Sequence, residues 1–276
     1  MGRKKVDDNT DEIQHSIDRL SDAYGGLLTI PVGRHNIDAT RGLKLKSNMT
    51  LRLEQGAELA AIPNNQAGSV VARVYDCINV QILGPGKIVG ERDTHIGTTG
   101  EWGNGIELRS SSNIKIAGDL MITRCWGDGI MLADGTSKNV EIDHVTSIGN
   151  RRQGLSVIDV DGLKVTYSSF LNTGGTAPGD GIDIEPDTDR QLASNIFIDW
   201  NIFTGNAGSS IGIGGPHGTF HNIVVGAHNV FDRKTQPIWV SGKAGKLGEP
   251  FWATALSMFK GQSWYRWWGY PTQWSA

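Results

Sequence analysis

A short phrase of the form Gly-apolar-x-apolar returns every 24 to 29 residues through the middle of this chain. Each period also holds two or three segments of three to six residues in which apolar and polar side chains alternate, as they do in short β-strands. One turn of such a chain cannot bury its apolar side alone, so the repeat predicts stacked turns that share one core. The copies begin at Gly105, Gly129, Gly154 and Gly181, with weaker echoes at Ser210 and Pro237.

A second series places asparagine at the start of one strand in most turns. Asparagine tolerates the left-handed backbone conformation of a tight turn, and its amide can bond to the equivalent amide in the next turn. We therefore expect a structural ladder rather than a functional site. Its members are Asn48, Asn79, Asn113, Asn139, Asn195 and Asn222, with Gly162 in the remaining place.

The opening segment follows a different pattern. From Asp11 to Tyr24 the apolar residues recur at helical spacing, Asn9 and Glu12 can form a capping box, and Gly25-Gly26 end the pattern. The sequence predicts an amphipathic helix that covers the open end of the coil, with Ile13, Ile17, Leu20 and Tyr24 facing inward. The expected organisation is a helical cap over 1–26, a parallel β-helix over 27–245 and a Trp-rich C-terminal cap or tail over 246–276.

Composition excludes several classes of protein. The 276 residues carry 26 Lys+Arg against 29 Asp+Glu, a net charge of −3 that offers no attraction for nucleic acid or an anionic membrane. No apolar run approaches the roughly 20 residues of a membrane span, and the first residues lack the apolar stretch of a secretory signal. Cys77 and Cys125 form no metal motif. We expect no cofactor, with Ca²⁺ as the alternative at an acidic cluster.

The residues between the inward apolar positions form outward columns when the turns are aligned. These columns contain acids, arginines and amides on one long face, as a polysaccharide groove requires. Immediately before the glycines stand Asn104, Asp128, Gln153 and Asp180, and after the first apolar residue stand Glu107, Met131, Ser156 and Asp183. Two residues further on, the column includes Arg109 and Glu185.

The stretch Asp180-Gly-Ile-Asp183-Ile-Glu185 is the strongest candidate for chemistry. Crowded carboxylates raise one another's pKa, which can place a protonated acid beside an ionised base. Asp128 and Asp180 lie two turns apart, about 10 Å between Cα atoms, which allows the carboxyl separation of an inverting glycosidase. We expect Asp180 and Asp183 to be the acid/base pair, supported by Asp128 and Glu185. Ordinary turn residues, or solvated or Ca²⁺-bound carboxylates, are the alternatives.

A second group of residues is expected to bind substrate. Arg152 can hold a sugar carboxylate with its planar guanidinium. Trp102 and Trp126 stand at equivalent positions in adjacent turns and could form a stacking platform for sugars, with corner packing as the equal alternative. His95, in a loop beside the same face, is the candidate proton carrier. The substrate-binding set is Arg152, Arg151, Gln153, Glu107, Arg109, Asn104, Trp102, Trp126 and His95.

From about Asp7 to Phe231 the sequence resembles the pectate-lyase-like superfamily of right-handed β-helix proteins, beginning with DDNTDEIQHSIDRL and GGLLTIPVGRHNI. Polygalacturonase-type glycosidases, uronan lyases, alginate C5-epimerases and phage tailspikes share such a start. The resemblance implies an all-β, single-stranded right-handed parallel β-helix with an N-terminal capping helix. It also implies a polysaccharide partner, an extracellular or virion-associated location, and a monomer or homotrimer.

The motifs divide between two of these families. GDGIDI at 179–184 is similar to the polygalacturonase stretch NTDGID, and GDGI at 127–130 with RQGLSV at 152–157 is similar to that family's GDDC and GHGLSI, with Gln153 in place of His. Asp128-Gly-Ile and Asn150-Arg-Arg-Gln-Gly resemble alginate-epimerase motifs, with Asn104 and Arg109 in place of the epimerase Tyr and His. The favoured function is therefore hydrolysis of an acidic polysaccharide. A uronan lyase or C5-epimerase, and a non-catalytic carbohydrate-binding or tail-fibre protein, remain the alternatives.

Overall fold

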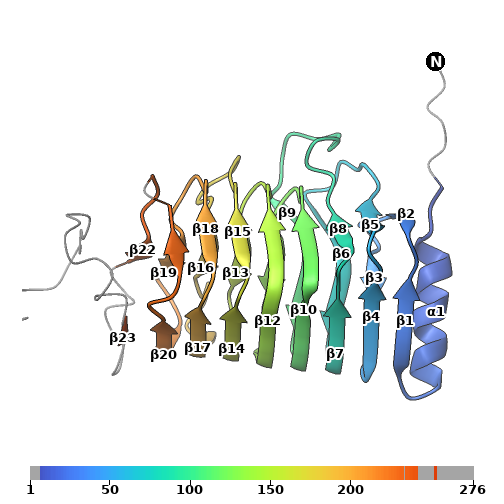
Figure 1. Cartoon of the computed structure of the whole chain (residues 1–276), viewed down its shortest axis with the longest axis horizontal. Helices are drawn as coiled ribbons and strands as arrows, with labels where there is room; N and C mark the ends of the chain where they lie inside the picture. The colour runs from blue at the N-terminus through green and yellow to red at the C-terminus, as the bar shows by residue number, and fades with distance from the viewer. Residues whose placement is uncertain (1–6, 233, 242–251, 254–276) are drawn as a thin grey trace, which may run out of the picture.

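The chain winds into a coil of parallel strands closed at one end by a helix (Figure 1). This computed structural model describes residues 7–232, 234–241 and 252–253. Every strand pair has parallel register, and the partners are separated by about one sequence repeat. The β-helix predicted from the repeat is confirmed.

The smaller of the two sheets takes one strand from each of eight turns. The Gly-apolar-x-apolar phrases supply most of these strands, so their apolar residues pair in register from turn to turn: Ile106 with Ile130, then Leu155, then Ile182. Along the sheet the strands are β3 (Leu43–Lys44), β6 (Gly68–Tyr75), β9 (Trp102–Arg109), β11 (Ile130–Leu132), β13 (Leu155–Val157), β16 (Ile182–Ile184), β19 (Ile211–Ile213) and β22 (Ile238–Val240).

The larger sheet has 15 strands and wraps the remaining sides of the coil. Its main path runs through β1 (Gly26–Ile30), β4 (Met49–Leu53), β7 (Ile78–Leu83), β10 (Ser112–Thr123), β12 (Ser137–Ile148), β14 (Val160–Thr166), β17 (Leu192–Asp199), β20 (Thr219–Val225) and β23 (Trp252–Ala253). Beside this path lie β2 (Gly33–Ile37), β5 (Ala57–Ala61), β8 (Lys87–Val89), β15 (Ser169–Leu171), β18 (Ile202–Thr204) and β21 (Val230–Phe231).

The core is a set of apolar columns that run along the coil axis. Ile106, Ile130, Leu155 and Ile182 are completely buried, as predicted, and Phe170 stacks on Phe203 with ring centroids 5.4 Å apart. Each such side chain contributes about 1.5–3 kcal/mol by leaving water. Because neighbouring turns share this core, the outward residues sit on a rigid support.

Asparagine side chains form the expected ladder on the outside of the large sheet. Asn79 donates to the amide oxygen of Asn48 at 2.9 Å, and Asn113 donates to Asn79 at 3.1 Å. These residues all have positive φ, and Gly162, at φ +92°, occupies the missing place. In that turn Asp161 supplies the acceptor for Asn195, at 2.8 Å.

A second, exposed ladder of rings also follows the large sheet. His144, Tyr167, Trp200 and His228 stack in that order, with successive centroids 5.1, 5.5 and 4.7 Å apart. The rings cover one another's faces, so the ladder presents mainly ring edges to solvent. The repeat did not reveal it, because Tyr167, Trp200 and His228 lie outside the strands and His144 lies within β12 at a residue with positive φ, where regular alternation is interrupted.

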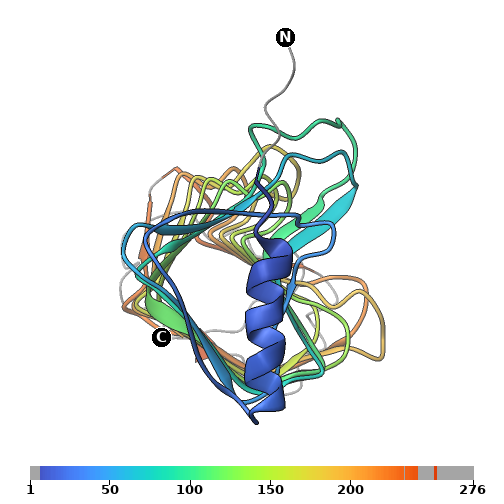
Figure 2. The same cartoon turned by 90° about the vertical axis from the view of Figure 1, so that its right-hand side faces the viewer.

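The helix α1 (Thr10–Asp22) lies across the open end of the coil, as Figure 2 shows. Ile13 and Ile17 are buried, which confirms the predicted apolar face, but Tyr24 is 92% exposed and lies beyond the helix. The predicted capping box between Asn9 and Glu12 is wrong. Asn9 is the N-cap residue without a side-chain cap bond, and its side-chain oxygen instead accepts the Asn36 N–H at 3.0 Å.

Within the described part of the chain, no helix is long and apolar enough to cross a membrane. The Trp-rich segment predicted as a C-terminal cap, 246–276, lies outside the described residues except for Trp252–Ala253. These two residues form β23, which pairs with β20.

Candidate active site

The outward column of the small sheet forms as the sequence predicts. Glu107, Met131, Ser156 and Asp183 pair in register from β9 to β16, and Gly212 of β19 takes the next place. The acidic stretch that begins at Asp180 therefore lies where β16 passes between β13 and β19. Glycine in β19 leaves the outer surface beside Asp183 without a side chain.

The four polar residues that precede the glycines form a buried hydrogen-bonded ladder. The side-chain oxygen of Asn104 accepts the Asp128 N–H at 3.1 Å, Asp128 accepts the Gln153 N–H at 3.0 Å, and Gln153 accepts the Asp180 N–H at 2.8 Å. Asp180 in turn accepts the Ser209 N–H at 2.5 Å. All four side chains are therefore fixed by the backbone of the following turn, a role that the sequence columns did not reveal.

The carboxylates of Asp180 and Asp183 converge above Gly212. A Cβ atom built on Gly212 would lie 2.4 Å from Oδ2 of Asp180 and 3.3 Å from Oδ1 of Asp183. The two oxygens are thus no farther apart than the sum of these distances. That upper limit is below the roughly 6.5–9.5 Å carboxyl separation of inverting glycosidases and includes the roughly 5–5.5 Å separation of retaining ones.

Burial raises the pKa of both acids, and the nearby Glu185 carboxylate adds to the shift of each. Asp180 is 4% exposed, and loss of solvent raises its pKa to about 6, although the hydrogen bond from Ser209 opposes the shift. Burial raises the pKa of Asp183 well above its usual range, and the nearby Glu185 and Asp180 carboxylates add to this. Burial also raises the pKa of Glu185, with a further contribution from Asp187. The pair can therefore hold a proton near neutral pH.

Gln153 connects the two acids. Its Nε2 donates to Oδ2 of Asp183 at 2.7 Å, while its Oε1 accepts the backbone N–H of Asp180. The side chain is completely buried, so Gln153 positions the acid pair and has no surface for substrate.

Arg152 lies beside the pair and is 16% exposed. Its Nη1 contacts Oδ2 of Asp128 at 3.2 Å, and its Nε lies 3.9 Å from Glu101. Among the described residues, the buried Arg152 Nε and the Oγ of Ser156 find no hydrogen-bond partner. Ser156 pairs in register with Asp183, so both groups border the acid pair.

Asp128 is completely buried beneath this surface. Burial raises its pKa to about 7 although Arg152 favours the ionised form. Its two oxygens bond the Gln153 N–H and the Arg152 guanidinium. Asp128 therefore supports Arg152 and Gln153 from below and does not reach the outer surface.

Glu107, Arg109 and Asn104 form a separate cluster in the turns before the acid pair. Oε1 of Glu107 accepts Tyr75 Oη and Arg109 Nε, each at 2.7 Å, and Oε2 accepts Asn104 Nδ2 at 2.9 Å. Glu107 is 4% exposed. Its oxygens are thus occupied within the protein, and Arg109 retains the exposed side of this cluster.

Trp126 is enclosed by two planar side chains. The His95 ring stacks on it with centroids 3.9 Å apart, and the Arg151 guanidinium lies 3.9 Å from its centroid. Two planar groups cannot both occupy that position on one face, so they cover opposite faces. Trp126 therefore has no free face for a sugar, in agreement with the alternative that it packs at a corner of the coil. Trp102, the other residue of the predicted stacking platform, is 51% exposed.

His95 is not a free proton carrier. Its side chain is 1% exposed, and its Nδ1 lies 3.0 Å from Oε2 of Glu91, which is also buried. Burial raises the pKa of Glu91. His217, which the sequence analysis did not select, lies beside the acidic stretch, with its Nδ1 3.2 Å from Oδ1 of Asp189. Burial raises the pKa of the neighbouring Asp187.

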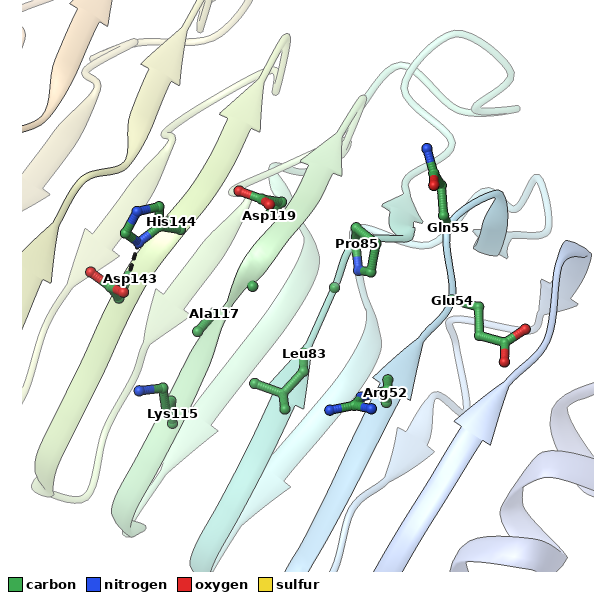
Figure 3. Close-up of a pocket in the computed structure, with 12 residues that line it drawn as sticks. Arg52, Glu54, Gln55, Leu83, Pro85, Lys115, Ala117, Asp119, Asp143 and His144 are labelled. Atoms are coloured by element: carbon green, nitrogen blue, oxygen red, sulfur yellow. Dashed lines mark hydrogen bonds and ion pairs between the residues drawn. The ribbon is translucent and has the colours of Figure 1, made fainter.

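A groove of about 680 Å³ lies elsewhere, on the outer face of the large sheet (Figure 3). Arg52, Lys115, Asp119 and Asp143 surround it, and none of the residues predicted for the site lines it. The sequence repeat gave no signal for this groove, because the bulge in β10 between Ala117 and Leu120 shapes it.

The described residues contain no group of three or more His, Cys, Asp or Glu side chains arranged to hold a metal ion.

Comparison with known proteins supports the fold. Residues 92–246 match the family model described as a right-handed beta helix region. The SPbeta prophage-derived uncharacterized protein YorA of Bacillus subtilis (strain 168) is 31% identical over 174 residues, which cover 56% of this chain and 29% of that protein. This chain thus spans less than a third of that curated relative.

Two solved structures illustrate the range of proteins with this fold. The hyperthermoactive exopolygalacturonase from Thermotoga maritima superposes with a TM-score of 0.60 at 16% identity, over 82% of this chain and 65% of that chain. PfbA, a surface adhesin of Streptococcus pneumoniae, gives a TM-score of 0.57 at 16% identity, over 88% of this chain and 74% of that chain. At such identities the likeness shows a shared fold alone. Since the family model matches more than half of the chain and the coil has the expected register, the chain belongs to the right-handed beta helix family.

Proposed function

We propose that the protein is a polysaccharide-active enzyme that hydrolyses a glycosidic bond at Asp180 and Asp183. The observation that carries this proposal is the convergence of the two carboxylates above Gly212, where no side chain intervenes. Carboxyl pairs at short separation and with raised pKa are the apparatus of acid-assisted glycoside hydrolysis.

The different environments of the two acids suggest their roles. Asp183, whose pKa burial and the neighbouring carboxylates raise well above its usual range, is the proton donor in this proposal and gives its proton to the glycosidic oxygen as the bond breaks. Asp180, with its pKa near 6, is ionised and faces the anomeric carbon. The short separation favours attack by Asp180 itself on that carbon, after which water releases the sugar and restores the proton to Asp183.

Neighbouring groups supply orientation and binding. Gln153 holds Asp183 and Asp180 in one arrangement through its two ends. Arg152, whose side chain is 16% exposed, is the cation beside the pair that can meet a substrate carboxylate. A partly exposed guanidinium suits the carboxylate of an acidic sugar, which supports an acidic polysaccharide as substrate.

Two alternatives rest on specific observations. A lyase or epimerase needs a base for the proton beside a uronic carboxylate, and His217 is the described histidine beside the acidic stretch. A non-catalytic binding or tail-fibre protein is supported by the prophage origin of the relative and by the likeness to an adhesin.

The first experiment is a panel of acidic and neutral polysaccharides, assayed for new reducing ends and for ultraviolet absorbance of unsaturated ends. Hydrolysis produces reducing ends without that absorbance, while a lyase produces both. Asp183→Asn should lower kcat by roughly 10²–10⁴-fold and leave glycan affinity within about tenfold, since the amide keeps the shape of the side chain.

Glu141→Gln is the matched control, because it makes the same change in a carboxylate on the opposite face, where Glu141 pairs with Lys115 at 3.3 Å. The control should keep full activity. Absorbance of unsaturated ends would replace the hydrolase with the lyase, and binding without either product would support the binding protein.

A further inference from the structure

One exposed aromatic residue stands in line with the acid pair. The outward column of the small sheet continues from Asp183 in β16 to Gly212 in β19 and then to Trp239 in β22. Ile238 and Val240, on either side of Trp239, pack against the core. Alternation along the strand therefore turns Trp239 outward, and it is 41% exposed.

The register sets the distance between the acid and the indole. Adjacent strands lie about 4.8 Å apart, so Trp239 stands about 10 Å from Asp183 along the sheet. The intervening residue, Gly212, is buried, and the Asp180 carboxylate fills the space that a side chain would take there. The acid pair therefore extends over β19 towards β22, the strand that carries the indole.

The surroundings of Trp239 differ from those of other tryptophans. Trp126 is enclosed between His95 and Arg151, and Trp200 is stacked between Tyr167 and His228. No stacked ring or guanidinium is found on Trp239 within the described residues. An indole with an uncovered face offers a large, rigid apolar surface to a ligand.

We propose that Trp239 forms a sugar-binding subsite next to the acid pair, with one pyranose ring of the substrate lying between the indole and the carboxylates that cover Gly212. The C–H face of that ring packs on the indole, and its glycosidic oxygen is presented to Asp183. The polysaccharide then runs along the coil axis across β16, β19 and β22. This proposal rests on the proposed hydrolase function. It predicts that Trp239 contributes to substrate binding without taking part in the chemical step.

The test measures glycan affinity by calorimetry in the Asp183→Asn background, where turnover does not consume the ligand. The probe is an oligosaccharide prepared from the panel polysaccharide that the protein binds or cleaves. Adding Trp239→Ala should weaken affinity roughly tenfold or more, as expected for a central aromatic anchor. Trp239→Phe should retain affinity within about threefold. Trp200→Ala, the control at an exposed tryptophan of the ring ladder on the large sheet, should have no effect on affinity.

Kinetics of the active protein provide the second readout. Trp239→Ala should raise KM for the oligosaccharide and leave kcat within about twofold, because the substrate is bound less tightly but meets the same acids. Trp239→Phe should restore KM. Circular dichroism and the thermal midpoint of each variant verify that the fold is retained.

The outcomes separate the two proposals. If the panel glycan is hydrolysed while Trp239→Ala changes neither Kd nor KM, the subsite is overturned and the hydrolase stands. If the oligosaccharide binds in a Trp239-dependent way but no bond is cleaved, the subsite stands and hydrolysis is overturned. If no polysaccharide in the panel is bound or cleaved, both are overturned.

Discussion

The Gln153 side chain donates to the Asp183 carboxylate at 2.7 Å while it remains completely buried, so one amide fixes the position of an acid that is itself only 4% exposed. The Oε1 atom of the same side chain accepts the backbone N–H of Asp180. The geometry of the pair therefore depends on a residue that the substrate does not touch.

Replacing this amide should damage both stability and catalysis. Gln153→Leu leaves the buried Asp180 N–H without its partner, which costs about 1–3 kcal/mol of unfolding free energy. It also releases Asp183, so kcat should fall at least tenfold. Urea unfolding and steady-state kinetics measure the two effects. Gln66→Leu, at an exposed loop position, is the control; a Gln153 variant with unchanged kcat would contradict the positioning role.

Activity should depend on pH through the same pair. The proposed mechanism needs Asp180 ionised and Asp183 protonated. Since burial raises the pKa of Asp180 to about 6, kcat/KM should rise with pH through about pH 6 and fall at higher pH as Asp183 loses its proton. The rising limb should vanish in the pH profile of the residual activity of Asp180→Asn. A flat profile between pH 4 and pH 8 in the unmodified protein would contradict these roles.

Stability should fall as pH rises over a similar range. The pKa of Asp180 is raised from 3.8 to about 6 in the folded state, so between these values the folded protein binds more protons than the unfolded chain. Raising the pH therefore lowers the unfolding free energy, by on the order of 3 kcal/mol for this group. Urea unfolding at pH 4 and at pH 7 gives the difference in unfolding free energy between the two pH values. Asp180→Asn should make this difference smaller, whereas Glu141→Gln should leave it unchanged.

A methyl group at Gly212 should disturb the acid pair directly. The new Cβ would lie 2.4 Å from Oδ2 of Asp180, so the carboxylate must move. We expect Gly212→Ala to lower kcat by tenfold or more and the unfolding free energy by about 1–3 kcal/mol. Gly68→Ala is the matched control, because its Cβ would meet Trp102 at 3.4 Å, an ordinary contact. Equal kinetics in both variants would argue against the convergence above Gly212.

The asparagine ladder offers a test of the fold. Asn113 has φ +57° and bonds Asn79 and Asn139. Asn113→Gly loses only the amide bonds, while Asn113→Ala also strains the backbone, so alanine should destabilise the protein by about 1–2 kcal/mol more than glycine. Urea unfolding of both variants gives the difference. Equal destabilisation would show that backbone strain is not what asparagine relieves.

The sequence could predict the coil because each turn repeats the same local chemistry. Spacing alone identified the inward residues, the asparagine ladder and the outward column that contains Asp183. Contacts made by irregular segments could not be predicted in this way. The loop that places His95 on Trp126 and the bend that exposes Tyr24 have no counterpart in other turns. The burial of Asp128 could not be predicted from the sequence either. Alternation of apolar and polar residues predicts which way a strand residue points, but not whether neighbouring loops cover it.

The outward column of the small sheet has a consequence for engineering. It presents one side chain per turn, and alternate turns are separated by about 10 Å, a distance at which substitutions usually act additively. Changes at Met131 and Asp183 should therefore combine without interfering, because the core beneath them stays the same. The face can be altered one turn at a time, and each change would address a single position along a bound polymer.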